Sequence, residues 1–152
     1  MNNEFLNFLK KKNLTYHFVV AFVLILFWLI LARNYYQYNH NFWAVYNVSI
    51  FTLASASIGL FVLYIIYSWI KFKFNLQGFL INFLVFLGIS WVILIFLETV
   101  GYHIFNIHNL KTAQYPGLPF CDCIHAPHWM QIVYFLMAPV YFLICKILKL
   151  EK

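Results

Sequence analysis

Charged side chains are the scarcest feature of this sequence. Only 9% of its 152 residues are Asp, Glu, Lys or Arg, against roughly 25% in an ordinary soluble domain. Hydrophobic residues make up 64% of the chain, and a soluble fold of this size could not bury so much apolar surface. The composition excludes a water-soluble globular domain and predicts a protein that is surrounded by lipid.

Acidic residues and cysteines are also few. Four Asp and Glu stand against ten Lys and Arg, for a net charge of +6. The basic residues lie in short clusters between apolar runs, which is the pattern of membrane topology signals and not of a nucleic-acid-binding face. Three cysteines cannot form a disulfide framework, and Cys145, alone in the last apolar run, is expected to be a small buried hydrophobe. We expect the lipid bilayer, and no nucleic acid, as a partner.

Long apolar runs fill most of the chain. They predict four membrane-spanning helices, at residues 14–33, 43–70, 76–104 and 128–148. Each run is near or above the roughly 20 residues that a helix needs to cross the hydrocarbon. The first run follows a basic start, as in a signal peptide, but the sequence after it lacks a small-x-small cleavage pattern, which favours an uncleaved span. The predicted fold is an all-α integral membrane protein, with residues 1–152 forming a single four-transmembrane-helix bundle.

The distribution of basic residues predicts the orientation of this bundle. With four spans, eight of them fall on one side of the membrane: Lys10, Lys11, Lys12, Lys71, Lys73, Lys146, Lys149 and Lys152. Only Arg33 and Lys111 fall on the other side. The positive-inside rule then places both termini on the cytoplasmic or matrix side of a bacterial or mitochondrial inner membrane. The segment between the third and fourth helices becomes an exofacial, Cys/His-rich loop.

Small residues occupy the middle of the second run, at residues 52–59 (TLASASIG). Ser55 and Gly59 are four apart and therefore share a helix face. Small side chains there let a neighbouring backbone approach closely, which is how membrane helices pack. We expect this face to pack inside the bundle, with a pore lining as the alternative.

The exofacial loop holds most of the chemically reactive side chains. Cys121, Cys123, His125 and His128 offer sulfur and imidazole donors that suit zinc or copper, and we predict them as metal ligands. Two alternatives stay open: cysteines that are free or bridged beside interfacial histidines, or thiol–disulfide chemistry, because a Cys-x-Cys disulfide closes a small ring and is labile. Pro127 suits the first turn of the fourth helix and would hold His128 at its mouth.

Three further side chains near the ends of the predicted spans are candidates. His103 and His128 could bind a haem between them, although zinc or copper is the favoured cofactor. Glu98 is the only charge in the third run, and a carboxylate at the edge of a span is a functional candidate. Glu98, His103 or His108 could complete a metal site with two or three of the loop ligands, and Glu98 could instead accept a proton or contact a quinone. The alternative is a structural carboxylate in the headgroup layer.

These features predict a small polytopic accessory subunit of an inner-membrane, energy-transducing or electron-transfer complex such as a respiratory chain. The chain is small and has no soluble domain, and its aromatic and small-residue helix faces suit contact with other integral membrane subunits. The alternative is a small membrane enzyme that uses a metal or thiols in the exofacial loop. The sequence has no base–nucleophile motif that would support this alternative, and it leaves open whether the chain is an enzyme. A transporter or channel component ranks third, because polar groups are sparse at the midplane.

Overall fold

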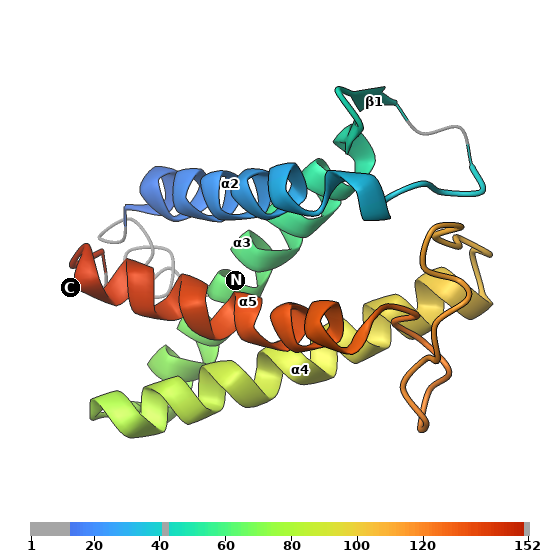
Figure 1. The fold of residues 1–152 in the computed structure, drawn as a ribbon. Helices are drawn as coiled ribbons and strands as arrows, with labels where there is room; N and C mark the ends of the chain where they lie inside the picture. The colour runs from blue at the N-terminus through green and yellow to red at the C-terminus, as the bar shows by residue number, and fades with distance from the viewer. Residues whose placement is uncertain (1–12, 41–42, 151–152) are drawn as a thin grey trace.

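The computed structural model describes residues 13–40 and 43–150, and this part of the chain is mostly helical (Figure 1). Its long helices are α2 (Leu14–Leu31), α3 (Ile50–Phe74), α4 (Phe79–His103) and α5 (His128–Ile147). All four are long and apolar enough to cross a membrane. The four predicted spans are confirmed as helices, and α5 begins at His128, directly after Pro127, as expected.

The predicted start of the second span, at residue 43, was wrong because α3 begins only at Ile50. The residues before it form a two-stranded antiparallel hairpin, β1 (Ala44–Val45) and β2 (Val48–Ser49). Tyr46 and Asn47 make its turn with φ values of 50° and 64°, as a two-residue hairpin turn of this hand requires. Ser49 then caps α3 by accepting a hydrogen bond from the Thr52 N–H at 3.2 Å. A local turn therefore shortens an uninterrupted apolar run.

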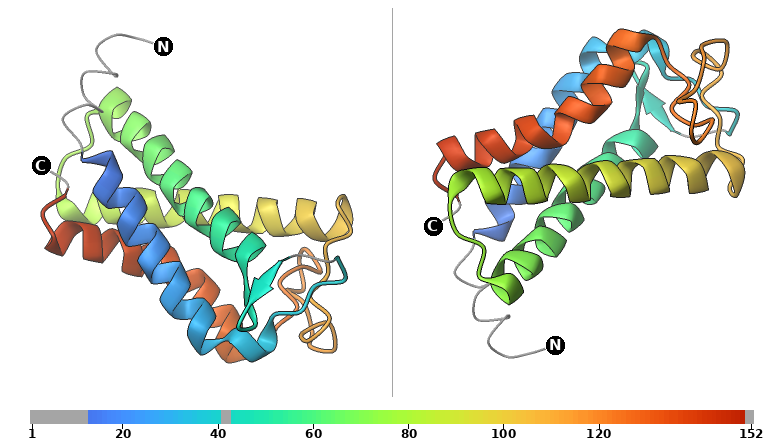
Figure 2. Two further views of the ribbon diagram at one scale, coloured as in Figure 1. Left: turned by 90° about the horizontal axis from the view of Figure 1, so that it is seen from above. Right: turned by 90° about the horizontal axis from the view of Figure 1, so that it is seen from below.

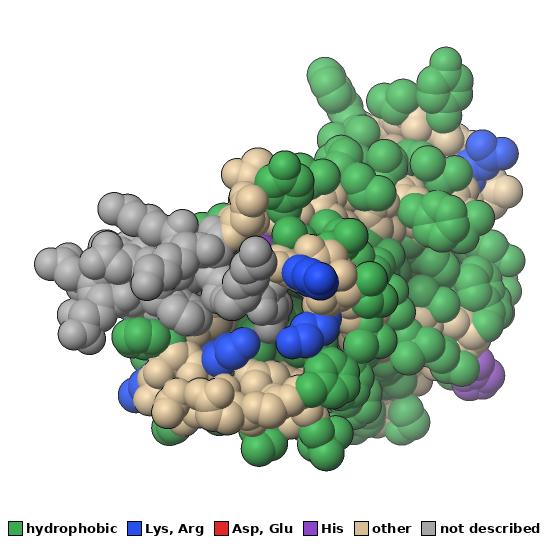
Figure 3. Space-filling model, turned by 90° about the vertical axis from the view of Figure 1, so that its left-hand side faces the viewer, with side chains coloured by type: hydrophobic (Ala, Val, Ile, Leu, Met, Phe, Trp, Pro, Cys, Tyr) green, Lys and Arg blue, Asp and Glu red, His purple; other side chains and the backbone are tan. Residues whose placement is uncertain are grey.

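The helices pack as a bundle in which α3 runs obliquely between α2 and α4 (Figures 1 and 2). The other contacts join α4 to α5 and α2 to α5. Basic side chains gather at one end of the bundle, where α2 and α4 begin and where α3 and α5 finish (Figure 3). We call this the lysine end. The opposite end, which carries the hairpin, a short 3₁₀ helix η1 (Arg33–Tyr35) and the segment between α4 and α5, is the loop end.

Pro139 lies inside α5 and leaves one backbone acceptor of that helix open. Proline has no N–H, so the carbonyl of Phe135, four residues earlier, loses its usual partner. The Trp91 indole N–H of α4 donates to that carbonyl at 3.1 Å, and the two rings meet edge to face. In lipid, an unpaired carbonyl would be costly, so this contact both satisfies α5 and ties it to α4.

The small-residue face of α3 does not pack inside the bundle, contrary to expectation. The buried positions of the helix include Leu53, Ser57 and Leu60, whereas Ser55 is exposed and a Cβ at Gly59 would meet nothing within 4 Å. The internal contacts are made by the face that carries Leu53, Ser57 and Leu60, which is offset around the helix from Ser55 and Gly59. The Ser55–Gly59 face is turned away from the other described helices.

Polar side chains also lie within the bundle toward the lysine end. His17 is fully buried and stacks on Tyr64 with ring centroids 3.6 Å apart, and the Tyr141 hydroxyl lies 3.3 Å from its Nδ1. The Tyr67 hydroxyl donates to the Asn82 side-chain oxygen at 2.8 Å. Tyrosines from α3 and α5 thus give polar partners to groups that lipid could not satisfy.

Candidate functional site at the loop end

Two segments far apart in the sequence are joined at the loop end. Residues 35–40, after α2, lie against residues 106–111, after α4, and backbone hydrogen bonds cross between them in both directions. Asn109 adds two side-chain bonds: its amide donates to the Tyr35 carbonyl at 2.8 Å, and its oxygen accepts from the Gln37 N–H at 3.1 Å. The connections that follow two different spans therefore form one ordered layer.

A chain of hydroxyl groups lies beneath this layer. The buried Trp28 N–H donates to the Tyr36 hydroxyl at 2.9 Å, and that hydroxyl is 2.8 Å from the Tyr134 hydroxyl of α5. Nearby, the Thr52 hydroxyl of α3 donates to the Tyr38 hydroxyl at 2.8 Å. We call Trp28, Tyr36, Tyr38, Thr52 and Tyr134 the tyrosine cluster. Through hydrogen bonds between side chains, it links α2, α3, α5 and the connection after α2.

Glu98 lies beside this cluster. It is 19 residues beyond Phe79 in α4, about 28 Å along the helix at 1.5 Å per residue. Burial raises the pKa of Tyr38 to about 12; the Thr52 hydrogen bond opposes the rise, and the charge of Glu98 adds to it. Burial likewise raises the pKa of Tyr36, with Glu98 contributing. Glu98 itself is exposed on α4, so a mobile proton or a ligand could reach it.

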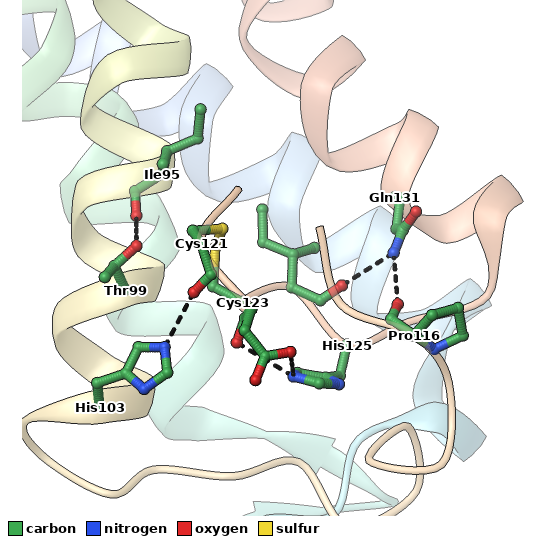
Figure 4. Close-up of a disulfide and its surroundings, with 10 residues drawn as sticks. Ile95, Thr99, His103, Pro116, Cys121, Cys123, His125 and Gln131 are labelled. Atoms are coloured by element: carbon green, nitrogen blue, oxygen red, sulfur yellow. Dashed lines mark hydrogen bonds and ion pairs between the residues drawn. A yellow bond between two sulfur atoms is a disulfide. The ribbon is translucent and has the colours of Figure 1, made fainter. Parts of the chain in front are cut away.

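The two loop cysteines are bridged, which is one of the states left open by the sequence. Cys121 and Cys123 form a disulfide with an S–S distance of 2.04 Å, and Cys123 is fully buried. The bridge lies beside α4, near Thr99 and His103 (Figure 4). The His103 Nε2–H donates to the Cys121 carbonyl at 2.9 Å, since a carbonyl can only accept. This hydrogen bond ties the short Cys-x-Cys turn to the last turn of α4.

The loop histidines stack on a tyrosine and do not converge on one point. The Tyr102 ring lies between His108 and His125, with centroid distances of 4.1 and 4.7 Å. His125 is also held through both ring nitrogens, Nδ1 by the Tyr115 carbonyl at 2.9 Å and Nε2 by an Asp122 carboxylate oxygen at 3.3 Å. The His125 ring nitrogens therefore face backbone and carboxylate oxygens and not a metal position shared with the other histidines.

Gly117 lets this loop close tightly. A Cβ there would come within 2.9 Å of the His125 Nε2 and 3.1 Å of Asp122 atoms, closer than side chains normally approach. Only glycine fits at this point without displacing the Asp122–His125 pair. The same packing brings Gln131 of α5 against the loop, where its amide donates to the carbonyls of Pro116 and Ile124 at 3.0 and 3.1 Å.

The predicted ligands are thus brought to one end of the molecule but not into one coordination sphere. Within residues 13–40 and 43–150, no three His, Cys, Asp or Glu side chains are grouped closely enough to hold a metal ion. His128 opens α5 and donates from Nδ1 to the Gln131 side-chain oxygen at 3.3 Å, apart from the stacked rings. Zinc, copper or haem binding by these residues stays a prediction, and thiolate ligation would first require reduction of the disulfide.

The tyrosine cluster was not predicted. The Tyr- and Asn-rich segment after the first span is typical of a headgroup layer, and its alternating Tyr36 and Tyr38 were the only signal that it faces the bundle. The four helices that are long and apolar enough to cross a membrane fit the multi-pass membrane class. No family model, curated protein or solved structure matches the chain.

Proposed function

We propose that this chain is a small accessory subunit of an inner-membrane complex that transfers electrons or protons. Its four apolar helices would sit in the bilayer with the lysine end on the cytoplasmic or matrix side and the loop end outside. The first residue of α2 and the last residue of α5 both lie at the lysine end, which agrees with this orientation. The loop end would then form an exofacial cap against a neighbouring subunit.

The observation that carries this proposal is the outward Ser55–Gly59 face of α3. Small residues four apart suit close packing of two membrane helices, and no described helix of this chain occupies that face. The occupant we propose is a membrane helix of another subunit, because lipid chains gain nothing specific from a flat small-residue surface. Packing of that helix on the Ser55–Gly59 face would leave the contacts within this chain's bundle unchanged.

Glu98 and the tyrosine cluster support a role in proton-coupled electron transfer. A carboxylate that stays accessible on a spanning helix is expensive unless it serves a partner, a proton path or a ligand. The charge of Glu98 acts on Tyr36, whose hydroxyl is bonded to that of Tyr134, and these neighbouring hydroxyls support a proton relay or a quinone contact at the loop end. Glu98 is the proposed proton-accepting group.

The disulfide favours a second candidate, a membrane thiol–disulfide enzyme. In such a reaction a dithiol substrate would be oxidised to its disulfide while Cys121–Cys123 is reduced to two thiols, and an electron acceptor in the membrane would restore the bridge. Cys121 is partly accessible and Cys123 is buried, so an incoming thiolate would attack the Cys121 sulfur. In the reduced state the thiolates, with His125 or His128, stay the proposed ligands for zinc or copper.

A substitution at Gly59 tests the subunit proposal without disturbing the fold. Gly59→Leu adds a side chain where the described structure has open space, and Ile58→Leu, at a neighbouring exposed position, is the matched control. Tagged chains are extracted from native membranes in mild detergent, and their assemblies are compared by native mass analysis. Gly59→Leu is expected to release the chain from a larger hetero-oligomer that Ile58→Leu preserves. A wild-type chain that migrates alone would contradict the proposal.

Glu98→Gln tests the role of the carboxylate. The amide keeps size and hydrogen bonding but cannot take up a proton, so the proposed role predicts loss of the complex's electron-transfer activity while the subunit stays assembled. Glu98→Asp is the control and should retain part of the activity. Full activity of Glu98→Gln in an intact assembly would show that the carboxylate is structural.

A further inference from the structure

The loop end contains a cavity of about 670 Å³. Its charged lining side chains are Arg33 from η1 and Lys111 from the segment after α4, and none of the described lining residues is a carboxylate. The ion pair found among the described residues is Asp122–His125, so neither cation is neutralised by a described carboxylate. Two positive charges that face a shared cavity without a counter-ion create an anion-binding potential.

The backbone that carries the two cations is held in place by the ordered layer above the tyrosine cluster. The Asn109 side chain bonds both segments: it accepts from the Lys111 N–H at 3.2 Å and donates to the carbonyl of Tyr35, the last residue of η1. The isolated bridge between Tyr38 and Asn109 extends the same contact. Because the backbone positions of Arg33 and Lys111 are set before a ligand arrives, less ordering entropy is lost on binding.

Neutral donors complete the lining. Amide side chains of Asn34, Gln37 and Asn47 border the cavity together with His40. Tyr36 and Tyr38 also line it, but their hydroxyls are hydrogen-bonded within the tyrosine cluster. Arginine forms paired hydrogen bonds with phosphate oxygens, and lysine adds a compact charge. The volume is larger than one phosphate needs and falls in the range of organic ligands, about 300–1,000 Å³. The chemistry therefore suits a phosphate that is attached to a small polar group.

The β1–β2 hairpin indicates that this cavity lies at the level of lipid headgroups. Ala44, Asn47 and Ser49 line the cavity, while Trp43, just before β1, and Tyr46, in the hairpin turn, are not among its lining residues and are 85% and 89% exposed. Exposed Trp and Tyr side chains concentrate in the interfacial layer of membrane proteins. In Figure 1 the hairpin projects from the end of the bundle beside the start of α3. An anion in this cavity would thus lie among headgroups.

We propose that the Arg33–Lys111 cavity binds the phosphate of an anionic phospholipid headgroup. The arginine fork would hold two phosphate oxygens, the lysine would neutralise the remaining charge, and the amides would contact the glycerol or other polar group of the lipid. This inference concerns a ligand site and does not depend on the proposed subunit role. A free phosphate offers the same chemistry from solution, and the experiment separates the two sources.

The test uses the full chain in nanodiscs made of equal amounts of phosphatidylcholine and phosphatidylglycerol. After transfer to a gentle detergent, native mass spectrometry measures how much of each lipid stays bound. Arg33→Gln and Lys111→Gln each remove one cation of the cavity, Lys111→Arg keeps the charge, and Lys149→Gln removes an exposed charge at the lysine end. A parallel arm titrates inorganic phosphate against the lipid-free protein, and thermal unfolding verifies that each variant is folded.

Wild-type protein is expected to retain phosphatidylglycerol over phosphatidylcholine. Loss of one charge-assisted contact should weaken this retention roughly tenfold or more, with Lys111→Arg and Lys149→Gln close to wild type. Binding of inorganic phosphate that depends on Arg33, without retention of phosphatidylglycerol, would overturn the lipid as the ligand. Equal retention of the two lipids, or equal losses in Arg33→Gln and Lys149→Gln, would overturn the site.

Discussion

Removing one hydroxyl from the tyrosine cluster should destabilise the protein more than removing any exposed hydroxyl. Tyr36→Phe deletes the atom that accepts from Trp28 and bonds to Tyr134. The ring itself is retained, so packing changes little. The consequence is that the indole N–H of Trp28, a residue only 8% exposed, loses its described partner.

The expected loss follows from these contacts. Two hydrogen bonds contribute about 1 kcal/mol each, and a buried donor left without a partner costs about 1–3 kcal/mol. Because the second figure overlaps with the first, we expect Tyr36→Phe to lower the free energy of unfolding by about 2–4 kcal/mol. Tyr134→Phe removes a single bond and leaves the Trp28 contact, so its loss should be about 1 kcal/mol.

The measurement is unfolding of the purified chain in mixed micelles of mild detergent and increasing SDS, followed by far-ultraviolet circular dichroism. Tyr16→Phe is the matched control, because Tyr16 is 58% exposed on α2, and such surface changes usually stay within about 0.5 kcal/mol. The predicted order of destabilisation is Tyr36→Phe, then Tyr134→Phe, then Tyr16→Phe. Equal effects of Tyr36→Phe and Tyr16→Phe would refute the hydrogen-bonded cluster.

Three further predictions concern topology, the loop and alkaline pH. A reporter fused after Lys152 should be cytoplasmic and one inserted at Thr112 exported; the reverse result would overturn the orientation. Replacing both Cys121 and Cys123 by Ser should lower the free energy of unfolding by only about 1.6 kcal/mol, because the bridge closes a three-residue loop. In the wild-type protein, alkylation should reach these sulfurs only after reduction. Elemental analysis of reduced, zinc-treated protein that finds no metal would refute the predicted ligands. Because the pKa of Tyr38 is raised from 10.0 to about 12 in the folded protein, stability should be intact below pH 10 and fall as pH rises toward about 12; Tyr38→Phe should reduce that fall in the same unfolding assay, and an unchanged fall would contradict the burial of this phenol.

Helix existence was predictable because the bilayer makes hydropathy a strong local signal. The third run was placed at residues 76–104 and is helical at Phe79–His103, and Pro127 correctly marked the start of α5. The start of α3 was missed because its turn uses Tyr46 and Asn47 with positive φ, and no glycine announces it. Local sequence signals therefore located the spans better than the short structures between them.

The direction in which a helix faces was less predictable. Ser55 and Gly59 were correctly placed on one face, but the sequence could not say whether that face meets this chain or another. Likewise, the crowding of Cys121, Cys123 and His125 predicted shared ligation, whereas the fold bridges the sulfurs and stacks the imidazole on Tyr102. Sequence proximity brings side chains near one another without setting where they point.

The sequence by itself determined the protein class and, for the described residues, the number of helices long and apolar enough to span a membrane. Through the segregation of its lysines it also predicts an orientation. Each of these depends on the sum of side-chain transfer energies over one continuous segment, a quantity that needs no knowledge of the neighbours. Only the tertiary structure decided that Arg33 and Lys111 face one cavity and that Trp28, Tyr36 and Tyr134 share hydrogen bonds. These side chains come from separate spans and connections, and their meeting depends on how the helices pack, which in lipid is set by shape and polar pairing instead of by hydrophobicity.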